Sequence, residues 1–151
     1  MNRDEILNQL EKLIQLDVDA THAYDQAIKN VDEQVFKEKL VSFQGDHRRH
    51  IDLLTAKVLE LGGTPPDLTS DFKGFVITGF TALRSLTGTK GALEAMETNE
   101  KLTNSRYQEA SQLVWPPDIS SIIQSNLADE QRHLSFVREA ISTITAAKKR
   151  P

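Results

Sequence analysis

The sequence lacks cysteine, long apolar runs and any segment dominated by charge of one sign. Without cysteine, the protein cannot form disulfides, zinc–thiolate sites, iron–sulfur clusters or redox-active thiols. No run of about 18 uncharged apolar residues is available to span a membrane, and the charged segment Met1–Lys12 lacks the apolar centre of a signal peptide. We therefore expect a soluble cytoplasmic protein with no membrane partner.

Charged residues of both signs are interspersed along the chain. The sequence has 18 Lys and Arg against 22 Asp and Glu, a formal net charge of −4, and it has no basic block that would indicate a nucleic-acid partner. At 151 residues, a single domain spanning 1–151 buries about 70% of its unfolded surface. Folding then requires no metal, so a metal bound by this protein would serve its function.

Apolar residues recur every three or four positions along four long segments, and no segment alternates as a β-strand does. This pattern predicts an all-α four-helix bundle made of two helical hairpins. The hairpins span about 4–61 and about 89–147, and a long crossover of about 62–88 joins them. Helical spacing within the crossover predicts a short helix, whose phenylalanine face is a candidate homodimer contact. Its apolar residues are Phe72, Phe75, Val76, Phe80, Leu83 and Leu86.

The two hairpins resemble each other in sequence. Segments 46–50 and 129–133, which lie 83 positions apart, share their first Asp, an Arg and their last His. The same offset pairs the only two tyrosines of the chain with each other, and it pairs Asp17 with Glu100. Two similar halves packed together explain a repeat of this length better than a solenoid does, because a solenoid needs three or more shorter units.

The repeated segments contain residues that bind metals. Glu130 and His133 are three positions apart, so both side chains lie on one face of a helix and can bind one ion. The apolar spacing of the four segments brings six ionisable residues to one level of the core. They are Asp17, His47, His50, Glu100, Glu130 and His133.

Three carboxylates buried without compensating charge would cost several kcal/mol each. One or two divalent ions would offset that cost. Carboxylate and imidazole ligands suit iron or manganese, and they also suit zinc. The alternative is that the six residues form a buried hydrogen-bonded network or line an empty polar cavity.

The acid, tyrosine and Glu-x-x-His pattern resembles the ferritin-like superfamily, in which rubrerythrins, bacterioferritins and ferritins bind two irons within a four-helix bundle. The resemblance covers nearly the whole chain apart from the crossover and the tail. It implies a ferritin-like bundle whose di-iron centre is bridged by Glu130. It also implies terminal ligands on each ion, which are Glu100 and His133 on one and Asp17 and His50 on the other.

The sequence departs from this family pattern at two positions, both in the first half. Asp17 is one methylene shorter than the family's Glu, and His47 occupies the position of the second bridging Glu. A single nitrogen cannot bridge two ions as a carboxylate does, so metal content and intermetal distance depend on this position. Tyr24 and Tyr107 match tyrosines that follow the family's acids. They are candidate catalytic proton donors or ordinary core tyrosines hydrogen-bonded to an acid.

Two functions of different classes follow from these expectations. The first is a di-iron carboxylate protein that reacts with oxygen or peroxide, as a ferroxidase or a peroxide-detoxifying oxidase. The second is a non-catalytic ferritin-like bundle with a degenerate or mononuclear metal site, acting as a stress-linked interaction protein. Metal content of protein purified without chelators separates the two.

Overall fold

The computed structural model describes residues 1–67 and 88–148. It contains four helices, which are α1 (Arg3–Asn30), α2 (Gln34–Glu60), α3 (Gly88–Ser111) and α4 (Pro117–Lys148). The described residues include no β-strand, so the predicted all-α four-helix fold is confirmed. The predicted crossover helix, with its candidate dimer face, lies outside the described residues.

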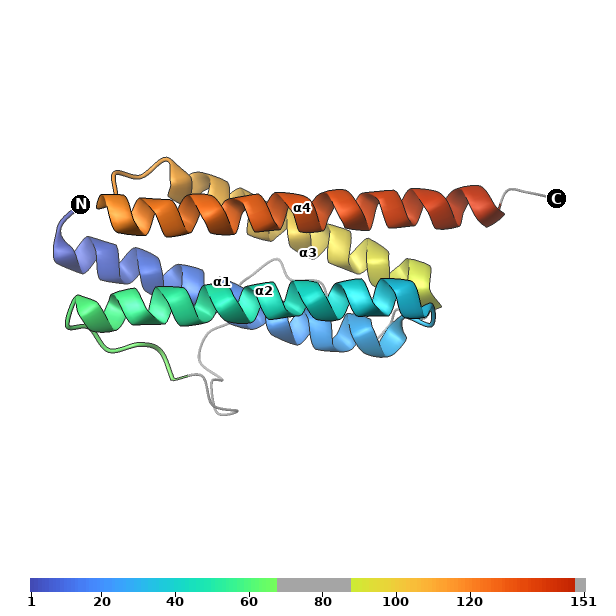
Figure 1. The fold of residues 1–151 in the computed structure, drawn as a ribbon, viewed down its shortest axis with the longest axis horizontal. Coiled ribbons are helices and arrows are strands. Elements are labelled where there is room, and N and C mark those ends of the chain that lie inside the picture. The colour runs from blue at the N-terminus through green and yellow to red at the C-terminus, as the bar shows by residue number, and fades with distance from the viewer. Residues whose placement is uncertain (68–87, 149–151) are drawn as a thin grey trace.

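The two hairpins, α1–α2 and α3–α4, lie side by side and form an elongated bundle (Figure 1). Helix α1 packs against α2 and α3, and α4 packs against α3 and α2. The end of α2 and the start of α3 lie at opposite ends of the bundle (Figure 1).

Local sequence signals fix the helix ends. The Asn2 side chain accepts a hydrogen bond from the Glu5 backbone N–H, and the Glu5 side chain accepts one from the Asn2 backbone N–H, each at 2.9 Å. This capping box satisfies two N–H groups that have no partner within the helix. At the end of α2, Gly62 takes a left-handed conformation with φ of 75°, as glycine commonly does after a helix. Pro117 starts α4, where its missing N–H costs nothing.

Buried side chains form two apolar clusters, one toward each end of the bundle. One cluster includes Leu10, Leu54 and Ile123, and the other includes Leu93 and Val137. A layer of buried polar side chains separates the clusters along the helices. Within the described ranges, none of the helices combines the length and the hydropathy that a membrane span requires. The cytoplasmic location stays a prediction.

Truncation of a fully buried leucine is expected to destabilise the bundle by about 2–5 kcal/mol. Leu54 on α2 is 0% exposed, whereas Leu59 on the same helix is 58% exposed. Leu54→Ala therefore leaves a cavity, and Leu59→Ala should change the free energy of unfolding by less than about 0.5 kcal/mol. Urea unfolding of both variants, followed by circular dichroism, measures the difference. Equal losses of stability would show that the buried face of α2 is assigned incorrectly.

Candidate metal centre

The six predicted metal-binding residues meet in the polar layer at the middle of the bundle. They form two groups of four, and in each group one ligand-type atom per residue lies within 4.8 Å of the others. The two groups share His47 and Glu130. The first group adds Asp17 and His50, and the second adds Glu100 and His133. All six side chains are at most 1% exposed, whereas the fourth histidine of the chain, His22, is exposed.

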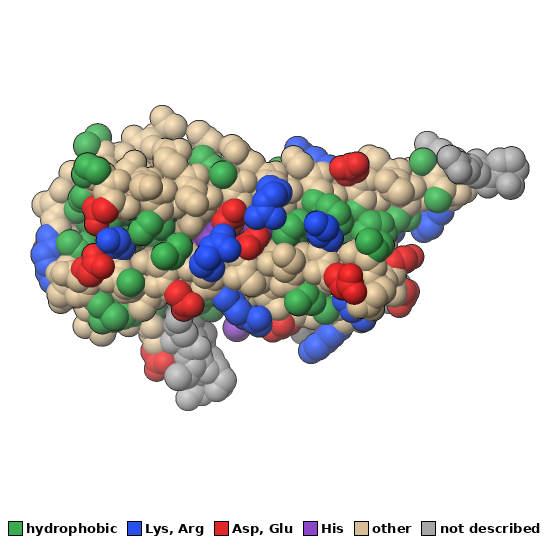
Figure 2. All heavy atoms as spheres, in the orientation of Figure 1, with side chains coloured by type: hydrophobic (Ala, Val, Ile, Leu, Met, Phe, Trp, Pro, Cys, Tyr) green, Lys and Arg blue, Asp and Glu red, His purple; other side chains and the backbone are tan. Residues whose placement is uncertain are grey.

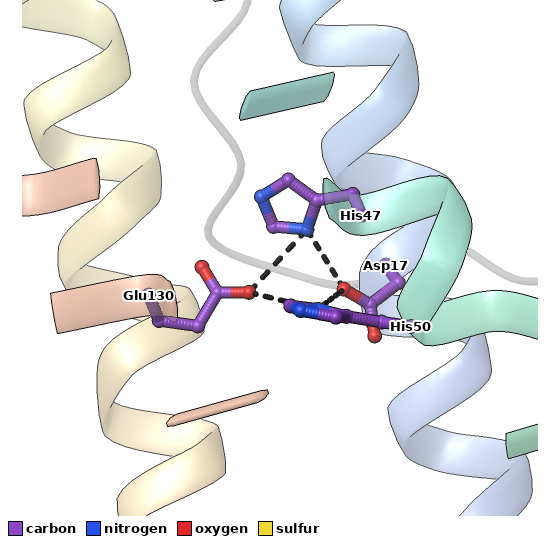
Figure 3. Close-up of side chains that lie close together, drawn as sticks. All are labelled: Asp17, His47, His50 and Glu130. Carbon is purple, nitrogen blue, oxygen red and sulfur yellow. Dashed lines mark hydrogen bonds and ion pairs between the residues drawn. The ribbon is translucent and has the colours of Figure 1, made fainter. Parts of the chain in front are cut away.

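The first group lies between α1, α2 and α4 (Figure 3). Asp17 Oδ1 is 2.7 Å from His47 Nδ1 and 3.1 Å from His50 Nδ1. Glu130 Oε1 is 3.4 Å from each of the same two nitrogens. Two imidazoles and two carboxyl groups therefore converge on one small volume, as ligands of a single ion do.

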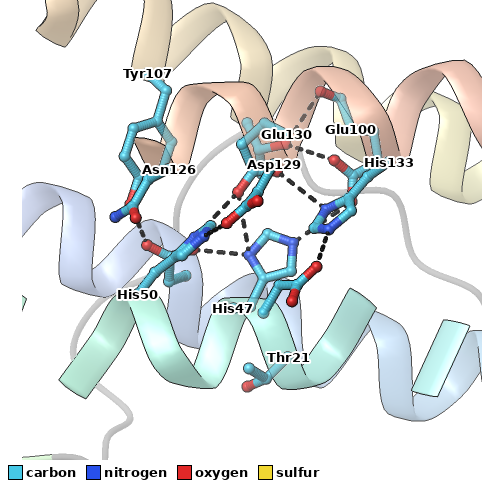
Figure 4. A network of polar contacts seen from close by, with 12 residues as sticks. Thr21, His47, His50, Glu100, Tyr107, Asn126, Asp129, Glu130 and His133 are labelled. Carbon is cyan, nitrogen blue, oxygen red and sulfur yellow. Dashed lines mark hydrogen bonds and ion pairs between the residues drawn. The ribbon is translucent and has the colours of Figure 1, made fainter. Parts of the chain in front are cut away.

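The second group lies between α2, α3 and α4 (Figure 4). Glu100 Oε1 is 3.5 Å from His47 Nε2 and 3.7 Å from His133 Nδ1. The other oxygen of Glu130, Oε2, is 3.6 Å from His133 Nδ1. The Glu130 carboxylate thus turns one oxygen toward each group.

Several polar atoms of these groups have no hydrogen-bond partner among the residues that the structure describes. They are both carboxylate oxygens of Glu130, His47 Nε2 and His133 Nδ1. Buried polar atoms are nearly always hydrogen-bonded, because an unpaired one costs about 1–3 kcal/mol. A closed hydrogen-bonded network, the alternative to a metal site, leaves these four atoms unsatisfied. The donor atoms present fit two divalent ions, one in each group.

An outer pair of carboxylates holds two of the histidines. His50 Nε2 is 2.8 Å from Asp129 Oδ2, and His133 Nε2 is 2.8 Å from Asp46 Oδ2. Each contact runs between α2 and α4, so each half of the repeat orients a histidine of the other half. A proton kept on Nε2 leaves Nδ1 free to face the candidate metal group, as carboxylate partners of metal-binding histidines commonly ensure.

Two arginines complete this outer layer. Arg49 and Arg132 each contact both Asp46 and Asp129. Figure 2 shows Lys or Arg and Asp or Glu side chains gathered at the middle of one face, beside a small area of histidine. Each of these two Asp residues therefore pairs with both arginines. Contacts between these Asp residues and the histidines were not predicted from the sequence. The Asp, Arg and His spacing shared by segments 46–50 and 129–133 could have indicated those contacts.

Each tyrosine donates a hydrogen bond to the acid of the other half. Tyr24 Oη donates to Glu100 Oε1, and Tyr107 Oη donates to Asp17 Oδ2 at 2.5 Å. Burial and the neighbouring carboxylates raise the pKa of both phenols well above their ordinary value, so both keep their protons. These contacts match the expectation for a core tyrosine beside an acid, and they place a proton next to each candidate terminal carboxylate.

The carboxylates also change the pKa values of the histidines. Burial alone would lower the pKa of His50, but Asp17 and Glu130 outweigh it and raise the pKa to about 10. In the same way Glu100 and Glu130 outweigh burial and raise the pKa of His133 to about 9. Because the ordinary value is about 6.5, this stabilisation of the metal-free fold is complete below about pH 6.5 and is lost as the pH rises through 9 and 10.

Metal binding near neutral pH is expected to release at least two protons, one from His50 and one from His133, because an imidazole nitrogen must lose its proton before it binds a metal. The apparent affinity should therefore increase with pH up to about 9–10. Calorimetric titration with zinc in buffers of different ionisation enthalpy counts the protons. A release near zero would contradict the raised pKa values.

A family model identifies the chain independently of the site. The model described as "Domain of unknown function (DUF2383)" matches residues 5–113. The chain belongs to the DUF2383 family. The matched part of this DUF2383 chain includes α1, α2 and α3 and ends before α4. No curated protein matched the DUF2383 sequence.

Solved structures with the same fold come from several bacteria. A bacterioferritin-related protein from Bacteroides fragilis, described as a dodecameric thioferritin, has 16% sequence identity and a TM-score of 0.79, with 99% of this chain and 91% of that chain covered. Dps from Thermosynechococcus elongatus has 17% identity and a TM-score of 0.77, with 91% and 90% covered. A ferritin-like, diiron-carboxylate protein from Bacillus anthracis has 19% identity and a TM-score of 0.71, with 93% and 99% covered. These similarities establish the ferritin-like fold predicted from the sequence.

Proposed function

We propose that this DUF2383 protein is a di-metal carboxylate protein, with two irons, that reacts with oxygen or peroxide. The observation that carries the proposal is Glu130, whose two buried oxygens each face one group of candidate ligands and accept no hydrogen bond from the described residues. A carboxylate placed in this way can hold two ions at once. The diiron-carboxylate description of the Bacillus anthracis structure supports iron, while manganese and zinc also suit the donor set.

The ligands divide between two ions. Asp17 and His50 would hold one ion, Glu100 and His133 the other, and Glu130 both. Two bound irons would supply the electrons that reduce oxygen or peroxide. With iron as substrate the protein would act as a ferroxidase, and with peroxide as substrate it would act as a detoxifying oxidase.

The surrounding residues prepare the site for this chemistry. The two apolar clusters exclude water from the polar layer on both sides along the bundle. Tyr24 and Tyr107 hold protons against the carboxylates of Glu100 and Asp17, which fixes the orientation of those ligands. A reduction of oxygen or peroxide consumes protons, and these two phenols are the proposed buried donors.

One observation favours a second function. His47 stands where the ferritin-like pattern has a carboxylate, so the six side chains include three carboxyl groups and three imidazoles. Less negative charge holds the second divalent ion less tightly. A bundle with one ion, acting as an interaction protein without catalysis, is the second candidate.

Metal analysis followed by oxidation kinetics tests the proposal. Protein purified without chelators is loaded anaerobically with ferrous iron, its iron content is measured, and oxygen or hydrogen peroxide is then added. Two irons per chain and faster oxidation than iron in buffer alone are expected. Substoichiometric binding of every transition metal, even after loading, would reject the di-metal centre. One tightly bound ion without accelerated oxidation would favour the interaction protein.

A further inference from the structure

His47 differs from the other two buried histidines in where its ring nitrogens lie. His50 and His133 each turn Nδ1 toward the candidate ligands and Nε2 toward an outer carboxylate, at 2.8 Å in both cases. The contacts of His47, in contrast, are with Asp17, Glu100 and Glu130, all within the two candidate metal groups. Within residues 1–67 and 88–148, no carboxylate outside the two groups contacts a ring nitrogen of His47.

The two nitrogens of His47 face different groups. Nδ1 lies 2.7 Å from Asp17 Oδ1 and 3.4 Å from Glu130 Oε1, in the first group. Nε2 lies 3.5 Å from Glu100 Oε1, in the second group, and forms no hydrogen bond with the described part of the chain. His47 and Glu130 therefore span the same two groups from the neighbouring helices α2 and α4, each with one ligand-type atom per group.

Neighbouring rings hold His47 in this orientation. Its ring centroid is 5.3 Å from Tyr24, 5.6 Å from His50 and 5.2 Å from His133. The side chain is 0% exposed, so it cannot swing toward solvent without repacking the bundle. The position of both nitrogens is thus set by the fold before any ion binds.

We propose that His47 bridges two divalent ions as an imidazolate. Nδ1 binds the ion held by Asp17 and His50, and Nε2 binds the ion held by Glu100 and His133. The inference rests on the proposed two-metal centre and specifies how its two halves are joined. The ferritin-like pattern has a second bridging carboxylate at this position, and here an imidazolate would take its place.

Charge and protons balance in this arrangement. Each ion binds one ring nitrogen, and every N–H proton on the ring leaves for solvent. No electron is transferred in these steps. Three carboxylates and one imidazolate then carry four negative charges, which match two divalent cations.

A bridging imidazolate also sets the spacing of the ions. The lone pairs of the two ring nitrogens diverge, whereas the syn lone pairs of the two carboxylate oxygens run nearly parallel. The two ions should therefore lie farther apart than the ~3.5–4 Å typical of paired catalytic metals. Glu130 would reach across the same span with one oxygen on each ion.

The test is the structure of the full chain loaded with cobalt(II), together with X-ray absorption of the same sample in solution. Cobalt is divalent, resists oxidation by air more than ferrous iron does, and scatters anomalously. Two cobalt ions are expected, each bound by one nitrogen of His47 at about 2.0–2.1 Å, the range of metal–imidazole bonds. Their separation should exceed ~4 Å.

Two other results would overturn the bridge. Two cobalt ions within ~4 Å, with His47 binding one or neither, would refute the bridge and leave the two-metal centre standing. One cobalt ion or none would refute both. As a matched comparison, cobalt-loaded His47→Glu should shorten the intermetal distance into the ~3.5–4 Å range, and an unchanged distance would also refute the bridge.

Discussion

Glu130→Ala is expected to reduce metal affinity by more than ~100-fold, whereas Asp17→Ala should reduce it by less. Outer-layer substitutions at metal sites typically cost 10–100-fold, and Glu130 is a candidate ligand of both groups. Asp17 belongs to one group only. Its loss would still leave Glu130, His47 and His50 on that ion, so the first ion should bind more weakly while the second is retained.

An anaerobic ferrous titration of the three proteins measures this difference. Glu139→Ala provides the control, because Glu139 is an exposed acid on the same helix as Glu130 and is not in either group. The control should bind iron as the parent does. Equal losses of iron affinity for Glu130→Ala and Asp17→Ala would argue against a larger role for Glu130. Circular dichroism of each variant separates lost ligation from lost folding.

His47→Glu is expected to bind two irons more tightly than the parent and to oxidise ferrous iron faster. A glutamate at this position restores the Glu-x-x-His spacing with His50 and mirrors Glu130 and His133. It is already ionised near neutral pH, whereas an imidazole must lose a ring proton to carry the same charge. Roughly tenfold tighter binding of the second iron needs only about 1.4 kcal/mol, well within the ~4 kcal/mol between unit charges 4 Å apart at an effective dielectric constant of about 20.

The rate should increase for a geometric reason. With carboxylate bridges alone and no imidazole ring between them, two ions can approach to ~3.5–4 Å, a spacing at which both can act on one small substrate. The comparison is iron stoichiometry and initial oxidation rate at matched iron and oxygen concentrations. If the variant loses iron or unfolds instead, His47 is a required ligand or core donor, and the native centre is specialised for nitrogen.

The two halves of the chain preserve their outer contacts and differ in their inner ligands. Asp46, Asp129 and the two arginines form reciprocal contacts across α2 and α4, so a change in one half disturbs a histidine of the other. The inner positions, at His47 and Glu130, lack such reciprocal hydrogen bonds. The reciprocal contacts explain why the two halves keep the same residues around the site. The absence of such contacts at the inner positions explains why His47 and Glu130 can differ.

The sequence by itself determined the helices and the residues of the polar layer. Apolar spacing placed four helices, and it put Asp17, Glu100 and Tyr24 on the inward faces where the structure buries them. The 83-residue repeat then identified matching positions in the two halves. These features are periodic along one chain, so they can be read without knowing how the helices pack.

Only the tertiary structure decided how the residues of the polar layer contact one another. It showed that the Glu130 carboxylate faces both groups without a hydrogen bond from any described residue. It also showed that Asp46 and Asp129 contact histidines of the opposite half, and that His47 presents a nitrogen to each group. These relations depend on the rotation and height of one helix against another and on the rotamer of each side chain. Helical periodicity defines which face of a helix points inward, but it leaves both of those variables free.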